Sequence, residues 1–222
     1  MLADLLPAAA SAVELYDDPP ALELFPEEAA CVAGAVERRR REFATGRLCA
    51  RIALRRLGHA PTAIVKGARG APRWPDGVVG SITHCVGYRA AAVARATDIA
   101  TIGIDAEPNL PLPDGILELV SLPRERARLA AIGDARPGVA WDRLLFSAKE
   151  SVYKAWAPVT GSWLDFDGAD ITIDPVAGTF VALLLCPGAD LVGDAQGELR
   201  GRFAVRSGLL VTAITRTMSA QA

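Results

Sequence analysis

The strongest constraint on the fold is the order in which helical and strand patterns follow one another along the chain. The clearest helical pattern runs from Val139 to Trp156, where apolar residues recur every three or four positions, and Pro158 is expected to end it. Residues 26–41 and 42–57 also have a helical pattern, and shorter helices are expected at 113–120 and 123–132. Strand patterns occupy residues 78–85, 88–95, 99–105, 169–173, 179–185, 201–205 and 209–215. Helices followed by strands that short turns connect predict an α+β fold with antiparallel strands.

A proline-rich segment, Pro108–Pro113, separates two regions with the same order of elements. On each side a helical region is followed by antiparallel strands, although no sequence repeat is visible. We therefore predict two similar α+β halves related by a pseudo-twofold axis. The N-terminal half would comprise residues 1–107 and the C-terminal half residues 108–222.

Composition excludes several classes of protein. Of the 222 residues, 51% are hydrophobic and 23% are charged, which is typical of a globular chain. The four cysteines are widely spaced and form no CxxC pair, which favours free thiols over a disulfide scaffold, and the two histidines argue against a structural zinc site. No apolar run approaches the ~18 residues of a membrane span, and the N-terminus lacks the basic stretch of a secretory signal. We expect a soluble, cytoplasmic protein.

Positive charge is concentrated in one part of the chain. Residues 37–73 carry eleven Lys and Arg against two Glu, whereas the formal net charge of the whole chain is −2. Such a segment is a candidate site for an anion, or else a solvated helix face without a ligand. Because the rest of the chain is acidic and no aromatic residues alternate with the arginines, a small polyphosphate fits better than nucleic acid.

Two further segments carry candidate chemistry. Asp105 and Glu107, two positions apart at the end of a strand, point to the same side, where they could bind Mg²⁺ together with substrate phosphates. Glu150 and Lys154 lie one helical turn apart, opposite the apolar stripe, with Lys149 beside them. They could form an ordinary surface pair or a phosphate site.

His84 ends another strand, shortly after the Gly- and Pro-rich loop at residues 67–77. A lone histidine at such a place is usually structural, but Arg47 and Lys66 in the same half make a phosphate contact plausible. The chain has no GxxxxGK[ST] loop, no GxGxxG motif and no GxSxG elbow, so side chains would have to hold the phosphates.

Three blocks in this order and spacing, GSITHC (80–85), IGIDAEP (102–108) and FSAKESVYKAW (146–156), resemble the signature blocks of 4′-phosphopantetheinyl transferases. The likeness is greatest to the longer, single-chain Sfp-type enzymes, in the actinobacterial and enterobactin-synthase-component-like branch, and GRLCAR (46–51) also fits that branch. The resemblance implies an enzyme that moves the 4′-phosphopantetheine arm of coenzyme A to a serine of an apo acyl or peptidyl carrier protein and releases 3′,5′-ADP. It also implies two similar halves with the active site in the cleft between them.

The resemblance further implies roles for individual residues. Asp105, Glu107 and Glu150 would bind Mg²⁺, with Glu107, Glu150 and Lys154 as catalytic residues. The residues implied to bind coenzyme A are Arg39, Arg47, Lys66, Thr83 and His84, together with Asp105. Gly70 and Arg73 belong to a loop, Gly70–Pro75, that would line the adenine, and Lys149 and Lys154 would face the pyrophosphate.

Other hypotheses remain open at this point. A Mg²⁺-dependent nucleotide phosphohydrolase or a non-catalytic coenzyme A-binding module could carry the same residues. The segment Pro113–Ile132 could dock an acidic carrier protein through Arg124, Arg126 and Arg128, or it could be a solvated amphipathic helix. Two halves in one chain favour a monomer, and neither nucleic acid nor a membrane is expected as a partner. Candidate pathways include fatty acid, polyketide, nonribosomal peptide and siderophore biosynthesis.

Overall fold

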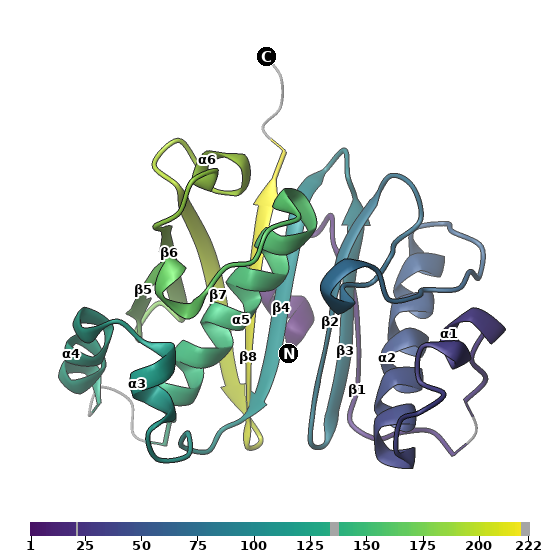
Figure 1. Ribbon diagram of the computed structural model, residues 1–222, viewed down its shortest axis with the longest axis horizontal. Coiled ribbons are helices and arrows are strands. Elements are labelled where there is room, and N and C mark those ends of the chain that lie inside the picture. The colour runs from purple at the N-terminus through teal and green to yellow at the C-terminus, as the bar shows by residue number, and fades with distance from the viewer. Residues whose placement is uncertain (21, 134–137, 219–222) are drawn as a thin grey trace.

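The computed structural model describes residues 1–20, 22–133 and 138–218 (Figure 1). Its strands are β1 (Ser11–Leu15), β2 (Val78–Cys85), β3 (Tyr88–Arg95), β4 (Ile99–Pro108), β5 (Ala169–Asp174), β6 (Thr179–Leu184), β7 (Glu198–Arg206) and β8 (Leu209–Thr217). Its α-helices are α1 (Pro26–Ala30), α2 (Glu37–Arg56), α3 (Ile116–Val120), α4 (Pro123–Ile132), α5 (Trp141–Thr160) and α6 (Ala189–Val192). The expected α+β class is confirmed.

The strands form two antiparallel sheets. One sheet has the order β1-β3-β2 and the other the order β4-β8-β7-β6-β5. The long helix α2 covers the first sheet and the long helix α5 covers the second (Figure 1). The strands β2 and β4, each at an edge of its sheet, lie next to each other in the middle of the molecule.

Side-chain hydroxyls join the two sheets where β2 meets β4. The hydroxyl of Ser81 accepts a hydrogen bond from the backbone N–H of Ile104 (3.2 Å), and the hydroxyl of Thr83 accepts one from the N–H of Ala106 (3.1 Å). These hydroxyls satisfy buried backbone groups that have no partner strand on that side. The end of β4, with its two acidic residues, is thereby held against β2.

Helix α5 approaches β4 unusually closely. A Cβ atom added to Gly103 would lie only 1.9 Å from the carbonyl oxygen of Ser151, so no larger residue fits at this contact. The hydroxyl of Thr101 donates to the carbonyl of Ala155 (2.7 Å) at the same contact. The apolar side chains of α5 also pack against β5–β8 of the same sheet in the largest core cluster, which includes Leu144, Val152, Phe180 and Ile214.

Several boundaries differ from the sequence-based expectations. Residues 26–41 and 42–57 do not form two long helices, because α1 ends at Ala30 and α2 is a single helix that begins at Glu37. Pro158 does not end α5, which continues to Thr160 and stops at Gly161 in the left-handed conformation (φ 64°). The strand β1 was not expected. All four cysteines are free, and among the described residues no helix is both long and apolar enough to cross a membrane.

Candidate active site

Two elements supply the acidic residues of the candidate site. Asp105 and Glu107 lie near the end of β4, and Glu150 lies on α5. The close contact at Gly103 brings the two elements together, because it lets the backbone of α5 lie directly on β4. Arg143, Ser147, Glu150 and Lys154 follow one another at intervals of four, three and four residues, which places them along one side of α5.

Asp105 is the most deeply held of these acids, with only 5% of its surface exposed. Its Oδ1 atom accepts hydrogen bonds from Lys154 Nζ (2.6 Å) and from the hydroxyl of Thr83 (3.2 Å). Its Oδ2 atom accepts a hydrogen bond from the hydroxyl of Ser147 (2.8 Å), which in turn contacts Thr212 Oγ1 (3.0 Å). Residues of β2, β8 and α5 therefore take part in orienting one carboxylate of β4.

The other two acids carry raised pKa values. Burial and the negative charge of Asp105 raise the pKa of Glu107, although Arg143, whose guanidinium lies 3.1 Å from Glu107 Oε2, opposes the shift. Burial also raises the pKa of Glu150; Lys154 opposes this shift and Asp105 adds to it. The three carboxylates therefore share one electrostatic environment, in which Lys154 is the common cation.

The donor chemistry of this cluster fits a hard divalent cation. Carboxylate oxygens are the ligands that Mg²⁺ prefers, and the negative charge of Asp105 adds to the effect of burial in raising the pKa of both Glu107 and Glu150. In the described part of the chain, however, no three Asp, Glu, His or Cys side chains are grouped closely enough to hold a metal. Lys154 and Arg143 pair with two of the three acids instead.

Basic side chains from α2 lie near the end of β2. His84 Nε2 contacts a guanidinium nitrogen of Arg39, and its Nδ1 lies 3.7 Å from the carboxylate of Glu42, which is also 3.5 Å from Arg39. Burial and the adjacent Arg39 lower the pKa of His84 to about 4. The imidazole is therefore neutral near pH 7, and Arg39 provides the positive charge beside it.

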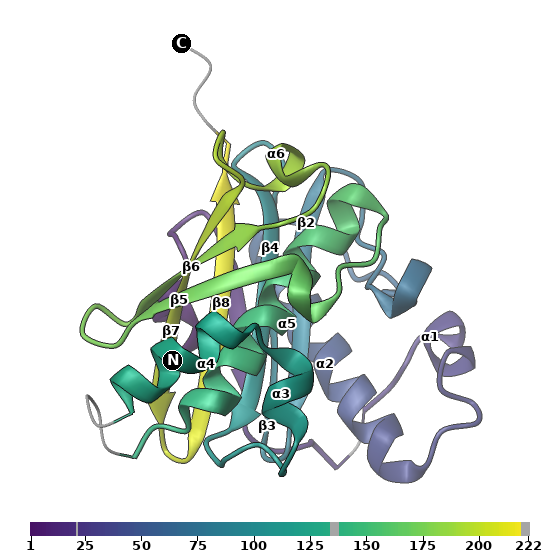
Figure 2. The same cartoon turned by 60° about the vertical axis from the view of Figure 1, so that its left-hand side comes forward.

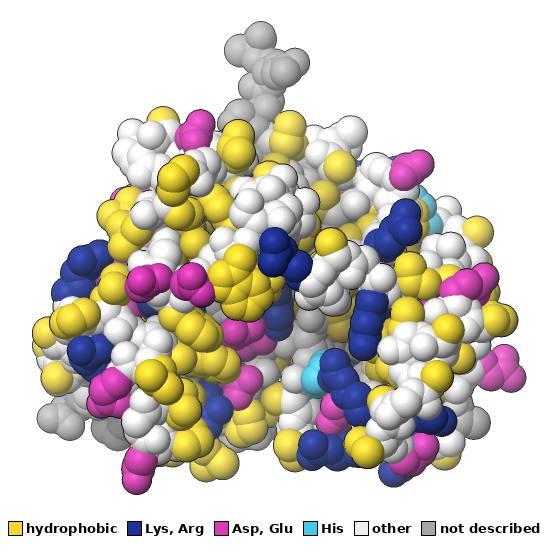
Figure 3. All heavy atoms as spheres, viewed as in Figure 1, with side chains coloured by type: hydrophobic (Ala, Val, Ile, Leu, Met, Phe, Trp, Pro, Cys, Tyr) yellow, Lys and Arg dark blue, Asp and Glu magenta, His cyan; other side chains and the backbone are white. Residues whose placement is uncertain are grey.

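Arg47 and Lys66 both lie close to one aromatic ring. The guanidinium of Arg47 is 3.8 Å from the centroid of Phe43 and the ammonium of Lys66 is 5.4 Å from it. Arg47 is buried and donates from Nε to the carbonyl of Ile64 (2.9 Å), and burial lowers its pKa to about 10. Lys66 is exposed. Figure 3 shows Lys and Arg side chains gathered on one side of a central furrow, with a histidine beside them.

One pocket lies between β2 and α5. It has a volume of about 170 Å³ and is lined by the loop Arg69–Pro72, by Gly80–Ile82 of β2 and by Glu150, Tyr153, Lys154, Ala157 and Pro158 of α5. Gly70 therefore faces the pocket, as expected for its loop, whereas Arg73 is exposed and does not line it. Arg69 Nε donates to the carbonyl of Gly161 (3.3 Å), which connects the loop to the end of α5.

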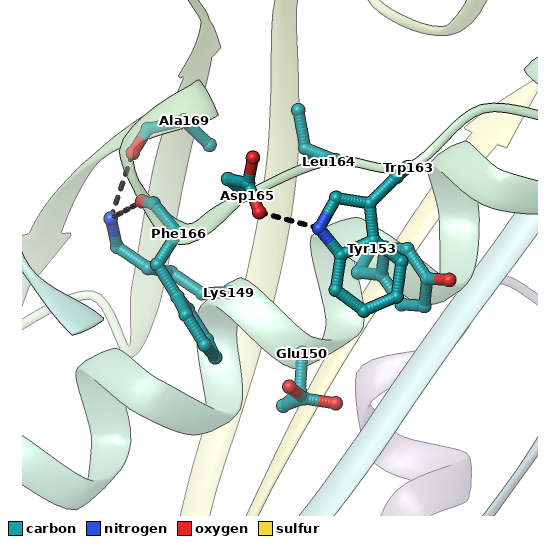
Figure 4. Close-up of a pocket in the computed structure, with 8 residues that line it drawn as sticks. All are labelled: Lys149, Glu150, Tyr153, Trp163, Leu164, Asp165, Phe166 and Ala169. Atoms are coloured by element: carbon teal, nitrogen blue, oxygen red, sulfur yellow. Dashed lines mark hydrogen bonds between the residues drawn. The ribbon is translucent and has the colours of Figure 1, made fainter. Parts of the chain in front are cut away.

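A second pocket, of about 230 Å³, lies on the other side of Glu150 (Figure 4). Its walls include the rings of Tyr153 and Trp163, whose centroids are 4.9 Å apart, and the side chain of Phe166. Asp165 accepts a hydrogen bond from the indole N–H of Trp163 (2.5 Å). Glu150 and Tyr153 line both pockets, so the two pockets meet at these residues.

Comparisons with known proteins show the family to which the chain belongs. Residues 27–94 match the family model of the 4′-phosphopantetheinyl transferase N-terminal domain, and residues 101–195 match that of the 4′-phosphopantetheinyl transferase superfamily. The chain is 60% identical over 218 residues to 4′-phosphopantetheinyl transferase Svp of Streptomyces mobaraensis, an alignment that covers 96% of this chain and 88% of the relative. The chain belongs to the 4′-phosphopantetheinyl transferase superfamily.

Other members of the superfamily span most of the chain. The chain is 48% identical over 222 aligned residues to 4′-phosphopantetheinyl transferase PptT of Mycobacterium tuberculosis, with 96% of this chain and 97% of the relative covered. It is 32% identical over 185 residues to enterobactin synthase component D of Salmonella typhi, with 82% and 75% covered. The resemblance drawn from the three sequence blocks is thereby confirmed.

The structure departs from the family-based expectation at Lys149. Its ammonium is buried, lies 2.9 Å from Glu125 Oε2 and donates to the carbonyls of Phe166 and Ala169, so it points away from Glu150 (Figure 4). A residue next to Glu150 in the sequence lies on a different side of the helix, because successive residues are about 100° apart. Lys149 therefore does not join the group around Asp105.

The arginines expected to face a carrier protein also have partners within the chain. Arg124 and Arg128 both bind Asp170, where α4 lies beside the edge strand β5 (Figure 2), and Arg126 binds the carbonyl and hydroxyl of Ser121. These contacts hold α4 in place. Docking of a carrier protein through this segment stays a prediction.

Three residues that orient the site of this superfamily member were not predicted from the sequence: Ser147 on Asp105, Arg143 on Glu107 and Glu42 beside His84. The first two could have been found, because the spacing 143, 147, 150, 154 predicts a polar side of α5 opposite its apolar stripe. Glu42 gives no such signal, since its neighbours on α2 are mostly arginines.

Proposed function

We propose that this member of the superfamily transfers the 4′-phosphopantetheine arm of coenzyme A to a serine of an apo carrier protein and releases 3′,5′-ADP. The observation that carries the proposal is the position of Glu150. This half-buried carboxylate, with a raised pKa, lies where two pockets meet and close to Asp105 and Lys154. The named relatives, which are 4′-phosphopantetheinyl transferases over nearly the full length of this chain, support the same activity.

The two pockets suit the two ends of coenzyme A. The pocket beside Gly70 lies on the side of the basic residues, which favours the phosphorylated nucleotide there, with Arg39, His84, Arg47 and Lys66 as phosphate-binding candidates. The pocket lined by Tyr153, Trp163 and Phe166 is largely apolar with polar groups at its edge, and this composition suits the slender pantetheine arm. A molecule that filled both would place its diphosphate beside Glu150.

Asp105, Glu107 and Glu150 would hold Mg²⁺ in this proposal. The cation would neutralise negative charge on the diphosphate and compensate the repulsion among the three acids. Asp105 is the best oriented of them because Thr83 and Ser147 support its two oxygens. Thr83 would thus serve coenzyme A indirectly, through Asp105.

The chain's own groups suffice for the proton transfer. Glu150 accepts the proton of the carrier serine as the serine oxygen bonds to the phosphorus that bears the pantetheine arm. The bond from that phosphorus to the bridging oxygen breaks, and 3′,5′-ADP leaves with the electron pair. Lys154, whose side chain is 27% exposed, can donate a hydrogen bond to the charge that develops on the leaving group.

Each half of the chain would have its own role in this reaction. Residues 1–107 would bind the nucleotide, and residues 108–222 would complete the acidic site and dock the carrier, in two similar halves with the site in the cleft between them. One chain carries all of these parts, which supports a monomer, and the protein is proposed to act in the cytoplasm.

The decisive experiment is the mass of an apo carrier protein after incubation with the enzyme, coenzyme A and MgCl₂. A gain equal to one phosphopantetheine arm on the carrier serine is expected, with no gain for Glu150→Gln. A nucleotide phosphohydrolase would instead release 3′,5′-ADP without a carrier. A module that only binds coenzyme A would leave the carrier mass unchanged, and either result would exclude the proposed transfer.

A further inference from the structure

Lys149 belongs to a buried group centred on Glu125, a carboxylate at the start of α4 whose side chain is fully buried. Glu125 Oε2 accepts hydrogen bonds from the backbone N–H of Leu122 (2.7 Å) and forms the ion pair with Lys149 (2.9 Å). Glu125 Oε1 accepts a hydrogen bond from the N–H of Ile171 in β5 (2.7 Å). One carboxylate thus joins the start of α4, the middle of α5 and the strand β5.

The same arrangement occurs around Glu28 in the N-terminal half. Glu28 Oε2 accepts from the N–H of Phe25 (3.1 Å) and pairs with Arg51 (2.8 Å), and its Oε1 accepts from the N–H of Ile64 (2.9 Å). Both carboxylates are the third residue of a short helix that starts with proline, and both bind a cation from the adjoining long helix. Lys149 on α5 therefore corresponds to Arg51 on α2.

Arg51 and Lys149 differ in their other hydrogen-bond partners. Arg51 donates to the carbonyl of Glu23 (3.2 Å), ahead of α1. Lys149 donates to the carbonyls of Phe166 and Ala169, and both of these residues line the pocket in Figure 4. A lysine ammonium has three N–H groups. With Glu125 and the two carbonyls as partners, all three are used, and none is left for a ligand.

We propose that Lys149 is a positioning residue, which shapes the wall of the aromatic pocket through Phe166 and Ala169 and does not bind the phosphates of the substrate. This inference rests on the proposed function, in which that pocket takes the pantetheine arm. The inference predicts an effect on some ligands and not on others. Loss of Lys149 should weaken the binding of ligands that carry the arm and spare ligands that lack it.

The test compares coenzyme A with 3′,5′-ADP, which keeps the nucleotide but has no arm, by isothermal titration calorimetry on the full chain. For Lys149→Met we expect the Kd of coenzyme A to rise about tenfold, whereas the Kd of 3′,5′-ADP changes less than about twofold. Lys154→Met is the matched control, because Lys154 lies beside Asp105 and is expected to contact phosphate. It should weaken the binding of both ligands.

Lys149→Met leaves Glu125 buried without its cation, which can prevent folding. The double variant Glu125→Gln/Lys149→Met removes both charges and keeps the test available. Its loss of coenzyme A affinity should equal that of Lys149→Met, because the two residues act as one unit, and KM for coenzyme A should rise more than kcat falls. An equal loss of affinity for coenzyme A and 3′,5′-ADP in the lysine variants would overturn the inference. Failure of the proposed function is a separate result, namely no mass gain on a carrier with the wild-type chain.

Discussion

The contact between Gly103 and α5 makes a quantitative prediction for Gly103→Ala. The added Cβ would lie 1.9 Å from the carbonyl oxygen of Ser151 and 2.8 Å from the backbone nitrogen of Ala155. Both atoms belong to the helix backbone, so no side-chain rotation can relieve the clash. Ordinary van der Waals contact begins at 3.4 Å, and β4 and α5 must therefore separate by about 1.5 Å at this point.

That separation acts on both the stability and the activity of the enzyme. Overpacking of this kind costs about 1–3 kcal/mol of unfolding free energy, and each kcal/mol lowers the Tm by roughly 2–4 °C in a chain of this length. The same movement carries Glu150 and Lys154 away from Asp105. Because a misplacement of about 1 Å costs on the order of 10²-fold in rate, kcat should fall about a hundredfold.

The assay is the rate of mass gain on an apo carrier at saturating coenzyme A, measured beside a thermal unfolding curve. Gly34→Ala is the matched control, because a Cβ at Gly34 would meet no atom within 4 Å; it should keep the wild-type rate and Tm. A Gly103→Ala enzyme with normal Tm and normal kcat would refute the argument that this glycine sets the distance between the two acidic elements.

Three further predictions concern the acids themselves. Ser147→Ala removes the hydrogen bond to Asp105 Oδ2 and should destabilise the fold by about 1.5–3 kcal/mol, measured by urea unfolding; an unchanged midpoint would count against this bond. The proposed base, Glu150, must be ionised, so activity should be lost as pH falls. Because burial raises the pKa of Glu150, the midpoint of the acidic limb of the kcat/KM profile should lie above the usual pKa of a glutamate. Lys154→Met should move that limb to higher pH, and a shift to lower pH would contradict the assignment. Chelation of divalent cations should stop transfer and added Mg²⁺ should restore it, whereas full activity in excess chelator would exclude the metal.

Much of the fold follows from local patterns in the sequence. The strands β2 and β3 run from Val78 to Cys85 and from Tyr88 to Arg95, as expected, because apolar residues occupy both and a two-residue turn separates them. The start of α2 was misplaced because the basic run from Arg38 to Arg41 is as compatible with the end of one helix as with the start of another. No side chain caps the helix at Val36, so the usual start signal is missing.

The site was predictable to the extent that its residues lie in sequence blocks typical of a known family. The three blocks contain Asp105, Glu107, Glu150 and Lys154, which the structure brings into one electrostatic group. The environment of Lys149 could not be predicted, because its partner Glu125 lies 24 residues earlier and only tertiary packing brings the two together. An isolated lysine in a sequence block is equally compatible with a buried ion pair and with a ligand contact.

The orientation of Asp105 ties the chemistry to the way the two sheets meet. Its carboxylate binds Thr83 of β2 and, on α5, both Ser147 and Lys154. The same hydroxyl of Thr83 accepts the N–H of Ala106, so a single side chain both joins the two sheets and positions the acid. Movement of one sheet relative to the other would therefore break both the hydrogen bond between Thr83 and Ala106 and the hydrogen bond between Thr83 and Asp105. The carboxylate of Asp105 is therefore correctly placed only when the two sheets are correctly joined.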